Sequence, residues 1–386
     1  MLIPLSPMDY YFLRKNLYTI QFVFPYEGRL DESRFRKAVA LALRNFPALC
    51  SRLKIISDTE AALEVQPIKD VSIRVLSLAD PFELSTEEDT AAHLVDSVIT
   101  EPGEPLLKLT LGYSKTRSYL AVSLSHLVGD GHSLFQFLIA IAEILRDRVA
   151  IEPSNDRLAL EAGMSNFARP VDLKRLFDET GYIRPRPPGP SSSAREKILY
   201  SFDAIEELKR EAEAREFGLT TNDIIMADLL RKFYTKVPLY NGQLIVRCPI
   251  DYRRIHPEVQ AGLLRKTYFG NSVCDAVALF DPICFQKQSL REVALQIRRA
   301  ILRVDAPAIL KNLECLRDLR LQEGIRVFES LGCPGLLVSN LTKMPFRQMD
   351  YGVGPPVRVI HASLNPRLAA LFADPRGIEV SICLSN

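Results

Sequence analysis

The spacing of hydrophobic residues changes several times along the chain, which predicts a mixture of helices and strands. Residues 106–124 predict a β-hairpin, because leucine and valine occupy alternate positions in two runs that a polar turn separates. Ahead of it we expect a helix, a strand and a second helix. That second helix begins after Asp31, a suitable N-cap, and its apolar stripe ends at Pro47. A further apolar stripe predicts a helix at 132–146.

The second half of the chain shows the same mixture. We expect a strand near 197–202, a helix capped by Asp203 and closed by Gly218, and a further helix from Thr221. A short apolar run at 244–246 predicts another strand.

Two more signals follow toward the C-terminus. Ser289 and Glu292 have the spacing of a capping box, which predicts the start of a helix whose apolar residues include Val293 and Ile297. Residues 334–384 are predicted to be mainly strands.

The clearest break in the pattern is a run of prolines and serines at 185–193, which cannot build a helix or a central strand. It predicts a crossover linker over 185–197, between an N-terminal domain at 1–184 and a C-terminal domain at 198–386. Both halves mix helices with strands, so the sequence predicts two α/β layered domains.

Charge and hydropathy exclude several classes of protein. The 386 residues include 49 Lys and Arg against 47 Asp and Glu, a net charge of +2. A balance so near neutral argues against nucleic acid as a partner, since neutralising phosphates needs a concentrated basic face. The first residues lack the basic region and the cleavage site of a signal peptide. We also find no apolar run long enough to cross a bilayer, so no membrane partner is expected.

Cysteine and histidine usage points away from disulfides and metals. The seven cysteines are odd in number and widely scattered, which is typical of reduced thiols and predicts a cytoplasmic protein. None of the five histidines stands at metal-ligand spacing with a cysteine or another histidine, so no metal site is expected.

The segment with the strongest chemical signal is Ser125-His126-Leu127-Val128-Gly129-Asp130-Gly131, between the predicted hairpin and the helix that follows. A histidine at the end of a buried strand is presented in a loop on a rigid support, where catalytic groups are often found. The two glycines permit a tight turn, so the Asp130 carboxylate can fold back onto backbone or an arginine. The alternative is an ordinary strand-end histidine followed by a turn.

This segment resembles the His-x-x-x-Asp-Gly signature of the CoA-dependent acyltransferase superfamily, which includes BAHD enzymes, chloramphenicol acetyltransferases and peptide-synthetase condensation domains. A second segment, Asp350-Tyr351-Gly352-Val353-Gly354-Pro355, is similar to the Asp-Phe-Gly-Trp-Gly motif of BAHD enzymes and lies about 220 residues further on, as that family places it. Weaker matches occur in the family's order: Leu5-Ser6-Pro7-Met8-Asp9, Asp251-Tyr252-Arg253-Arg254 and Tyr268-Phe269-Gly270-Asn271.

The resemblance implies two chloramphenicol-acetyltransferase-like domains, each a mixed sheet flanked by helices, with the active-site channel between them. It implies acyl-CoA as co-substrate, with no permanently bound cofactor, and transfer to a hydroxyl or amine of a small-molecule acceptor in specialised metabolism. His126 would be the general base, a role that suits a side chain with an unperturbed pKa of about 6.5. Asp130 would be structural, paired with Arg253. A monomer is expected.

The remaining roles also come from the resemblance. Ser339 and Asn340 lie where the family places oxyanion donors. Asn271 would lie beside the CoA channel, and Gly131 belongs to the first motif. The second motif, Asp350, Tyr351, Gly352 and Gly354, would hold a loop at the CoA entrance or form a turn without ligand contact.

The chain departs from the family pattern where tryptophan is missing, since Val353 replaces the tryptophan of the second motif and Asn340 replaces another. Two alternatives stay open. One is transfer from a carrier-protein thioester, as in condensation domains, although Ser125 stands where those carry the first of two histidines. The other is a non-catalytic scaffold of the same fold.

Overall fold

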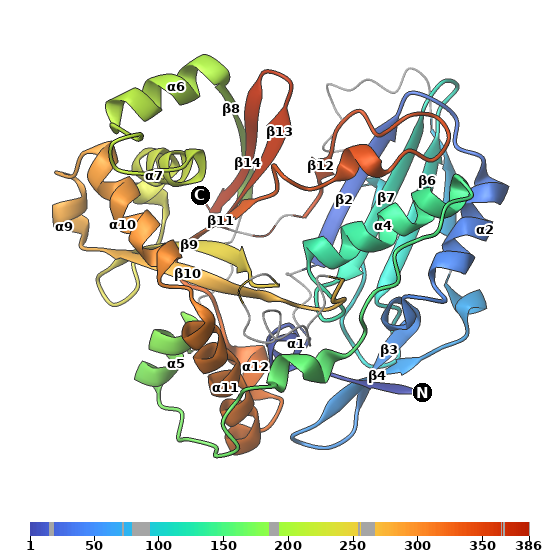
Figure 1. The fold of residues 1–386 in the computed structure, drawn as a ribbon, viewed down its shortest axis with the longest axis horizontal. Helices are drawn as coiled ribbons and strands as arrows, with labels where there is room; N and C mark the ends of the chain where they lie inside the picture. The colour runs from blue at the N-terminus through green and yellow to red at the C-terminus, as the bar shows by residue number, and fades with distance from the viewer. Residues whose placement is uncertain are drawn as a thin grey trace.

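The computed structural model describes residues 1–14, 19–71, 73–78, 93–184, 193–253, 255, 267–363, 365 and 367–385. The chain forms two lobes, each built on a mixed sheet flanked by helices, with a group of helices below and between them (Figure 1). The mixed α/β fold of the prediction is confirmed. The linker predicted at 185–193 falls almost entirely outside the described residues, and the domain boundaries stay a prediction.

The sheet of the first lobe has five strands in the order β12-β2-β7-β6-β5. Their bounds are β12 (Ile360–His361), β2 (Thr19–Tyr26), β7 (Ser118–Ser125), β6 (Leu107–Tyr113) and β5 (Ile73–Ser77). The predicted hairpin is confirmed as β6 and β7, which pair antiparallel. β12 comes from the C-terminal half of the chain and pairs with β2, so the two halves share this sheet.

β7, the strand that leads to His126, is buried along its whole length because both faces of its sheet are covered. Leu120, Val122 and Leu124 point into the main core below α4 (Gly131–Leu145) and α2 (Glu32–Ala42), while Tyr119 and Ala121 join a smaller core on the other face. Alternate side chains of a strand point to opposite faces, so this one strand contributes to two cores. That double packing makes a rigid support for the loop that follows.

The sheet of the second lobe has six strands in the order β10-β9-β11-β13-β14-β8. Their bounds are β10 (Val273–Phe280), β9 (Leu244–Asp251), β11 (Leu336–Asn340), β13 (Leu368–Asp374), β14 (Gly377–Ser385) and β8 (Ser193–Ser201). Four helices flank it, namely α6 (Phe202–Glu211), α7 (Thr221–Phe233), α9 (Pro282–Phe285) and α10 (Leu290–Leu302). On β11, Leu336 and Val338 point into this core, which leaves Leu337 and Ser339 on the opposite face, toward the first lobe.

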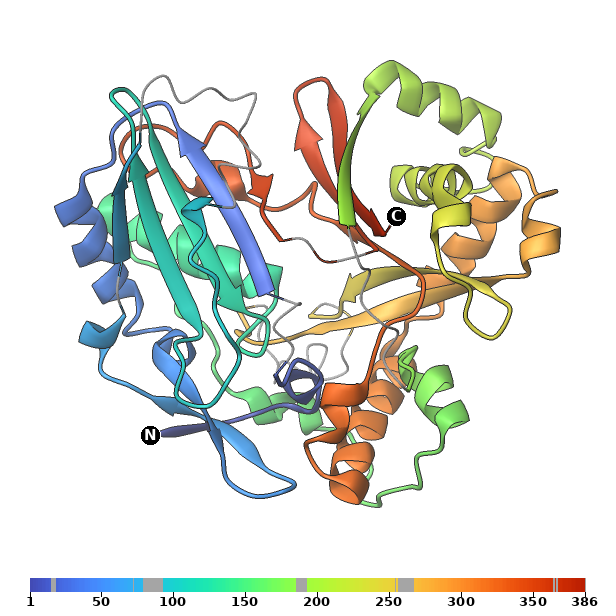
Figure 2. The same cartoon turned by 180° about the vertical axis from the view of Figure 1, so that it is seen from behind.

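The helices at the base join the two lobes (Figure 2). They are α1 (Pro7–Tyr11), α5 (Leu173–Thr180), α11 (Ala306–Glu323) and α12 (Val327–Ser330), and α1 and α5 both pack against α11. A small sheet of β1 (Leu2–Pro4), β4 (Ala61–Val65) and β3 (Ser51–Ile55) lies beside them. Short 3₁₀ helices complete the elements: Pro47–Cys50, Ile68–Asp70, Arg157–Glu161, Tyr234–Lys236 and Phe346–Gln348.

Several predicted boundaries are wrong. α2 is capped by Asp31 as predicted but ends at Ala42, before the turn that precedes Pro47. α6 is capped by Ser201 rather than Asp203, and it ends at Glu211, well before Gly218.

The helix predicted to begin at Ser289 is confirmed as α10, with both hydrogen bonds of the capping box present.

Two larger differences lie in the C-terminal third. The strands predicted over 334–384 are interrupted, because the segment between β11 and β12 folds as loop around one 3₁₀ turn. The 18-residue helix α11 was not predicted at all.

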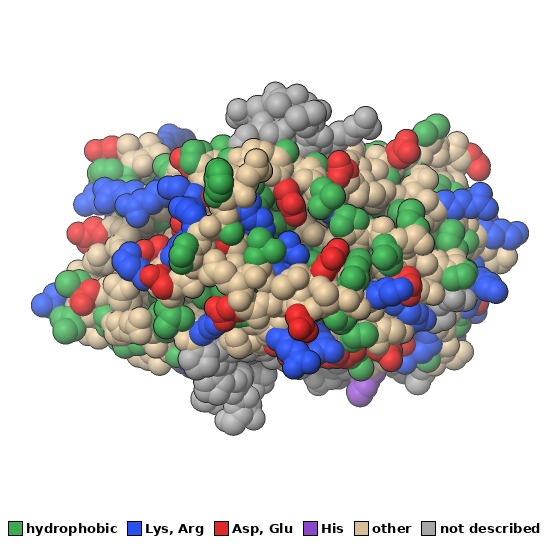
Figure 3. All heavy atoms as spheres, turned by 90° about the horizontal axis from the view of Figure 1, so that it is seen from below, with side chains coloured by type: hydrophobic (Ala, Val, Ile, Leu, Met, Phe, Trp, Pro, Cys, Tyr) green, Lys and Arg blue, Asp and Glu red, His purple; other side chains and the backbone are tan. Residues whose placement is uncertain are grey.

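The surface agrees with the balanced composition. Seen from below, basic and acidic side chains are interspersed over the face that Figure 3 shows. Within the described residues, no helix is both long and apolar enough to cross a membrane.

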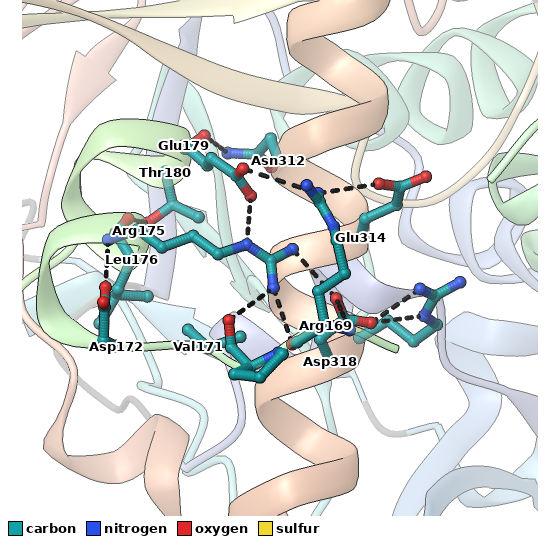
Figure 4. Close-up of polar contacts among 12 residues, drawn as sticks. Arg169, Val171, Asp172, Arg175, Leu176, Glu179, Thr180, Asn312, Glu314 and Asp318 are labelled. Atoms are coloured by element: carbon teal, nitrogen blue, oxygen red, sulfur yellow. Dashed lines mark hydrogen bonds and ion pairs between the residues drawn. The ribbon is translucent and has the colours of Figure 1, made fainter. Parts of the chain in front are cut away.

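A buried ion network fastens α5 and the segment before it to α11 (Figure 4). Asp318, on α11, is fully buried and accepts from Arg175 at 3.0 Å, from Arg317 at 2.7 Å and from the Arg169 backbone N–H at 3.0 Å. Arg175 also pairs with Glu179 at 3.0 Å. The contacts of Asp318 with Arg175 and Arg169 join residues that lie 143 and 149 positions apart in the sequence.

Replacing Asp318 with alanine is expected to destabilise the fold by about 3 kcal/mol, because it removes the buried carboxylate that two largely buried guanidinium groups share. The matched control is Lys174→Ala, which removes an exposed pair with Asp178 on α5 and should change stability by less than about 0.5 kcal/mol. Urea unfolding of both variants measures the difference. Equal effects would contradict the assigned role of Asp318.

Candidate active site

A cavity of about 320 Å³ lies between the two lobes, and residues from both sheets and from α1 line it. Its wall is predominantly apolar and includes Met8, Phe12, Phe22, Met344 and Leu368. A few polar side chains also line the cavity, among them His126. A mainly apolar pocket with a few convergent polar groups is the usual form of a small-molecule site.

His126 lies on the wall of this cavity, directly after β7. Its Nδ1 is 2.9 Å from Oδ1 of Asn271, and its ring stacks on Phe12 with 3.8 Å between centroids and 11° between planes. Burial lowers the pKa of His126 below its usual value near 6.5, and the negative charge of Asp130 opposes this shift only in part. The imidazole is therefore neutral, and able to accept a proton, at neutral pH.

Asp130 also lines the cavity, and its carboxylate organises the loop. It caps α4 by accepting the Ser133 N–H at 2.9 Å, and it accepts the Ser272 N–H at 3.0 Å. Both of its oxygens meet Arg253 at 2.9 Å in a bidentate pair. Burial raises the pKa of Asp130, but the charge and hydrogen bonds of Arg253 outweigh that effect and bring the pKa to about 2. The predicted pairing of Asp130 with Arg253 is present in the structure.

The β9–β10 hairpin explains how the second lobe reaches the motif. Asp251 pairs with Val273 at the end of the ladder, so Arg253 and Asn271 extend beyond it toward the first lobe. Arg253 also donates to the carbonyls of Tyr268 at 3.1 Å and Gly270 at 3.0 Å. The loop that carries His126 is thus held at both ends by residues of the second lobe.

That Asn271 lies beside the CoA channel stays a prediction. In the structure its side chain is fully buried and bonds both His126 and Asp9. The reason is the close packing of its loop on the motif, where the Asp130 N–H bonds the Gly270 carbonyl and Ser133 bonds Gly270 twice.

Ser339 and Asn340 both line the cavity at the end of β11. Asn340 donates to Asn222 at 2.9 Å and accepts from Thr342, so its side chain is already engaged. Gly131 lines the cavity at the start of α4, where an added Cβ would meet no atom within 4 Å. Gly129, by contrast, has no space, because a Cβ there would come within 2.9 Å of the Ser133 Cβ.

The second motif forms a turn that is not part of the described cavity wall. Asp350 accepts the N–H groups of Gly352 and Gly354, each at 2.9 Å, and pairs with Arg146 of the first lobe at 3.2 Å. Both glycines have positive φ, 95° and 85°, a conformation that other residues rarely adopt. Tyr351 is buried and donates to the Leu138 carbonyl at 3.0 Å. The motif therefore fastens the loop between β11 and β12 onto α4.

Two residues of the site were missed from the sequence. Phe12, which stacks on His126, lies in an apolar run that gave no sign of function. His361, for which the sequence gave no sign of function, is on β12 and also lines the cavity, with its ring 5.7 Å from that of Phe22. Burial lowers the pKa of His361 to about 3, so it is neutral.

Comparison with known proteins finds a family and relatives that match this chain over most of its length. The model of the Transferase family matches residues 3–386. Tryptamine benzoyltransferase 2 of Oryza sativa subsp. japonica is 25% identical over 95% of this chain and 87% of its own length. A hydroxycinnamoyl-CoA:piscidic acid hydroxycinnamoyltransferase of Actaea racemosa is 24% identical over 86% of this chain and 81% of its own.

Among solved structures, TRI101 of F. sporotrichioides, complexed with coenzyme A and T-2, has the same fold. Its TM-score is 0.78 at 16% identity, and the match covers 99% of this chain and 95% of the other. The family match spans nearly every residue. The chain therefore belongs to the Transferase family of BAHD enzymes and is a CoA-dependent acyltransferase.

Proposed function

We propose that this enzyme transfers an acyl group from acyl-CoA directly to a hydroxyl or amine of a small-molecule acceptor, with His126 as the general base. The observation that carries the proposal is a neutral histidine on the wall of an interlobe cavity. Asn271 is hydrogen-bonded to Nδ1 of His126, so Nε2 is the ring nitrogen left to accept a proton. It takes that proton from the acceptor's hydroxyl oxygen or amine nitrogen as this atom attacks the thioester carbonyl. No acyl-enzyme is required.

The charge that develops on the carbonyl oxygen needs hydrogen-bond donors. Ser339 is the better candidate, because it lies on the cavity face of β11, beside Leu337. Asn340 has one amide hydrogen committed to Asn222 and its oxygen committed to Thr342. We therefore assign the oxyanion role to Ser339 first and to Asn340 second.

Release of free CoA thiol tests the proposal. Purified protein is incubated with acyl-CoAs from acetyl to aromatic, together with mixed alcohols and amines, and each donor is also run without acceptor. Acceptor-dependent release supports direct transfer from CoA. If CoA binds but thiol appears only when the same acyl group is presented on a carrier protein, the donor is a carrier-protein thioester instead.

The cavity wall also predicts the class of acyl group. Among the described residues that line the cavity, Arg253 is the one Arg or Lys, and Asp130 and Asp251 already pair with it. A carboxylate on the acyl group would be buried without a cation, which costs several kcal/mol. We expect kcat/KM for malonyl-CoA to be at least about 100-fold lower than for an uncharged acyl-CoA of similar size, such as butyryl-CoA. Comparable values for the two donors would contradict this assignment.

A further inference from the structure

We infer that Asp9, acting through Asn271, holds His126 in the tautomer that carries its proton on Nδ1, so that Nε2 faces the acceptor as a lone pair. Asp9 and Asn271 are thus positioning residues for the base, an inference that rests on the proposed function of His126. The three side chains come from three separate segments: α1, the loop before β10 and the loop after β7.

Asp9 has one carboxylate oxygen for its structural contacts and the other for Asn271. Its Oδ2 accepts the Ser6 N–H at 2.8 Å, which closes the capping box of α1, and accepts Arg157 at 2.6 Å. Its Oδ1 accepts Nδ2 of Asn271 at 2.7 Å. Asp9, Asn271 and Arg157 are each at most 1% exposed. Arg157 also donates to the Val128 carbonyl, inside the first motif.

These contacts fix which way the Asn271 amide points. Its NH₂ group donates to Asp9 at 2.7 Å and to the His126 carbonyl at 2.8 Å, and both of these oxygens can only accept. The amide oxygen is therefore the atom 2.9 Å from Nδ1 of His126. An oxygen facing a neutral imidazole at that distance requires the proton on Nδ1. Asp130, four residues from the histidine, bonds neither ring nitrogen in the contacts of the described residues.

The substitution Asp9→Asn should reverse this chain of donors and acceptors. The new amide oxygen must stay at the Oδ2 position, where Ser6 and Arg157 both donate, so the new NH₂ group faces the NH₂ group of Asn271. The Asn271 amide can relieve this contact by turning, which brings its NH₂ group to Nδ1 of His126 and sets its oxygen against the His126 carbonyl. In that orientation Nδ1 must accept, and the proton moves to Nε2, where it blocks the base.

The test is nitrogen-15 NMR of histidine-labelled protein without substrate, with His126→Ala used to assign the His126 signals. We expect the Nδ1–H form in the wild type and loss of that form in Asp9→Asn. We also expect kcat to fall on the order of 100-fold, with KM for acyl-CoA within about twofold. A wild type with the proton on Nε2, or an Asp9→Asn variant that keeps the Nδ1–H form, overturns the proposal whatever its activity.

Asp223→Asn is the matched control. Asp223 is also fully buried and closes the capping box of α7 with Thr220, but it does not contact His126 or Asn271. The Asp223→Asn variant should lose about as much thermal stability as Asp9→Asn and leave the NMR signals of His126 unchanged. Because the tautomer is measured without substrate, an error in the proposed reaction would not alter this result.

A second pair of variants decides the question if Asp9→Asn does not fold. The side chains introduced by Asn271→Asp and Asn271→Leu are similar in size, but only the aspartate keeps an oxygen toward Nδ1 of His126. In Asn271→Asp, a proton shared between the new carboxylate and Asp9 replaces the amide N–H that Asn271 donated to Asp9. We expect Asn271→Asp to keep the Nδ1–H form and at least tenfold more activity than Asn271→Leu. Equal activity and the same tautomer in both variants would overturn the proposal.

Discussion

Replacing His126 with alanine is expected to lower kcat by roughly a thousandfold while KM for acyl-CoA changes little. General-base catalysis by a positioned side chain contributes about 10²–10⁴ to the rate, and the ring bonds the Asn271 side chain and its own backbone. Loss of the ring also removes the stack on Phe12, so part of any change in stability has that origin. Steady-state release of CoA thiol measures both constants.

The pH dependence of the same reaction gives an independent measure of the base. Burial lowers the pKa of His126, so protonation inactivates the enzyme only at acidic pH. Activity should rise through an apparent pKa below 6.5 and then stay level across neutral pH. This acidic limb should disappear in His126→Ala.

The control is His93→Ala, because His93 is exposed on the surface of the first lobe. It should keep both the rate and the pH profile of the wild type. If His126→Ala retains more than about a tenth of the wild-type rate, His126 is not the base.

Replacing Asp130 with alanine is expected to give the largest loss of stability, about 3–5 kcal/mol of the 5–15 kcal/mol typical of a folded protein. The change removes the cap of α4 and leaves the Arg253 guanidinium, whose side chain is 2% exposed, without its bidentate partner. It should also misplace His126, since the two residues share one loop. Urea denaturation and the rate of CoA release measure the two effects.

A double-mutant cycle separates the stability that comes from the Asp130–Arg253 pair from the stability that comes from the cap of α4. Asp130→Ala with Arg253→Met should be less destabilised than the sum of the single variants, because the double variant leaves no unpaired buried charge. Additive effects would mean that the pair has no coupling energy and that the cap alone explains the role of Asp130.

Acid sensitivity follows from the same pair. The pKa of Asp130 is about 2 in the folded protein, below its usual value of 3.8, so its ionised form stabilises the fold. That contribution is complete above the unfolded value and is lost as the pH falls from about 4 toward 2. Asp130→Ala should lack this component of acid unfolding.

The sequence predicted the parts of the site that depend on local pattern. β7 and α4 each carry a clear period, so the loop between them, with His126 and Asp130, could be placed before the structure was known. The partner Arg253 came from the family resemblance alone, because it lies 123 positions from Asp130 in the sequence.

Contacts without a local signature were not predictable. The Asp9–Asn271 bond joins residues 262 positions apart, and nothing in the sequence indicated that Asn271, expected beside the CoA channel, would contact Asp9. The cap of α6 was misplaced for a related reason. Ser201 and Asp203 are both suitable caps, but β8 stays paired with β14 as far as Ser201, so the helix begins directly after that residue.

The position of β14 has a consequence for when this enzyme can become active during synthesis. Residues 377–385 pair with β13 on one side and with β8 on the other, so the second sheet lacks an inner strand until they leave the ribosome. Arg253 and Asn271 extend from the β9–β10 end of that sheet. A nascent chain therefore carries His126 long before it carries a folded lobe to hold it, and we expect catalytic competence to arise only after translation has passed residue 385.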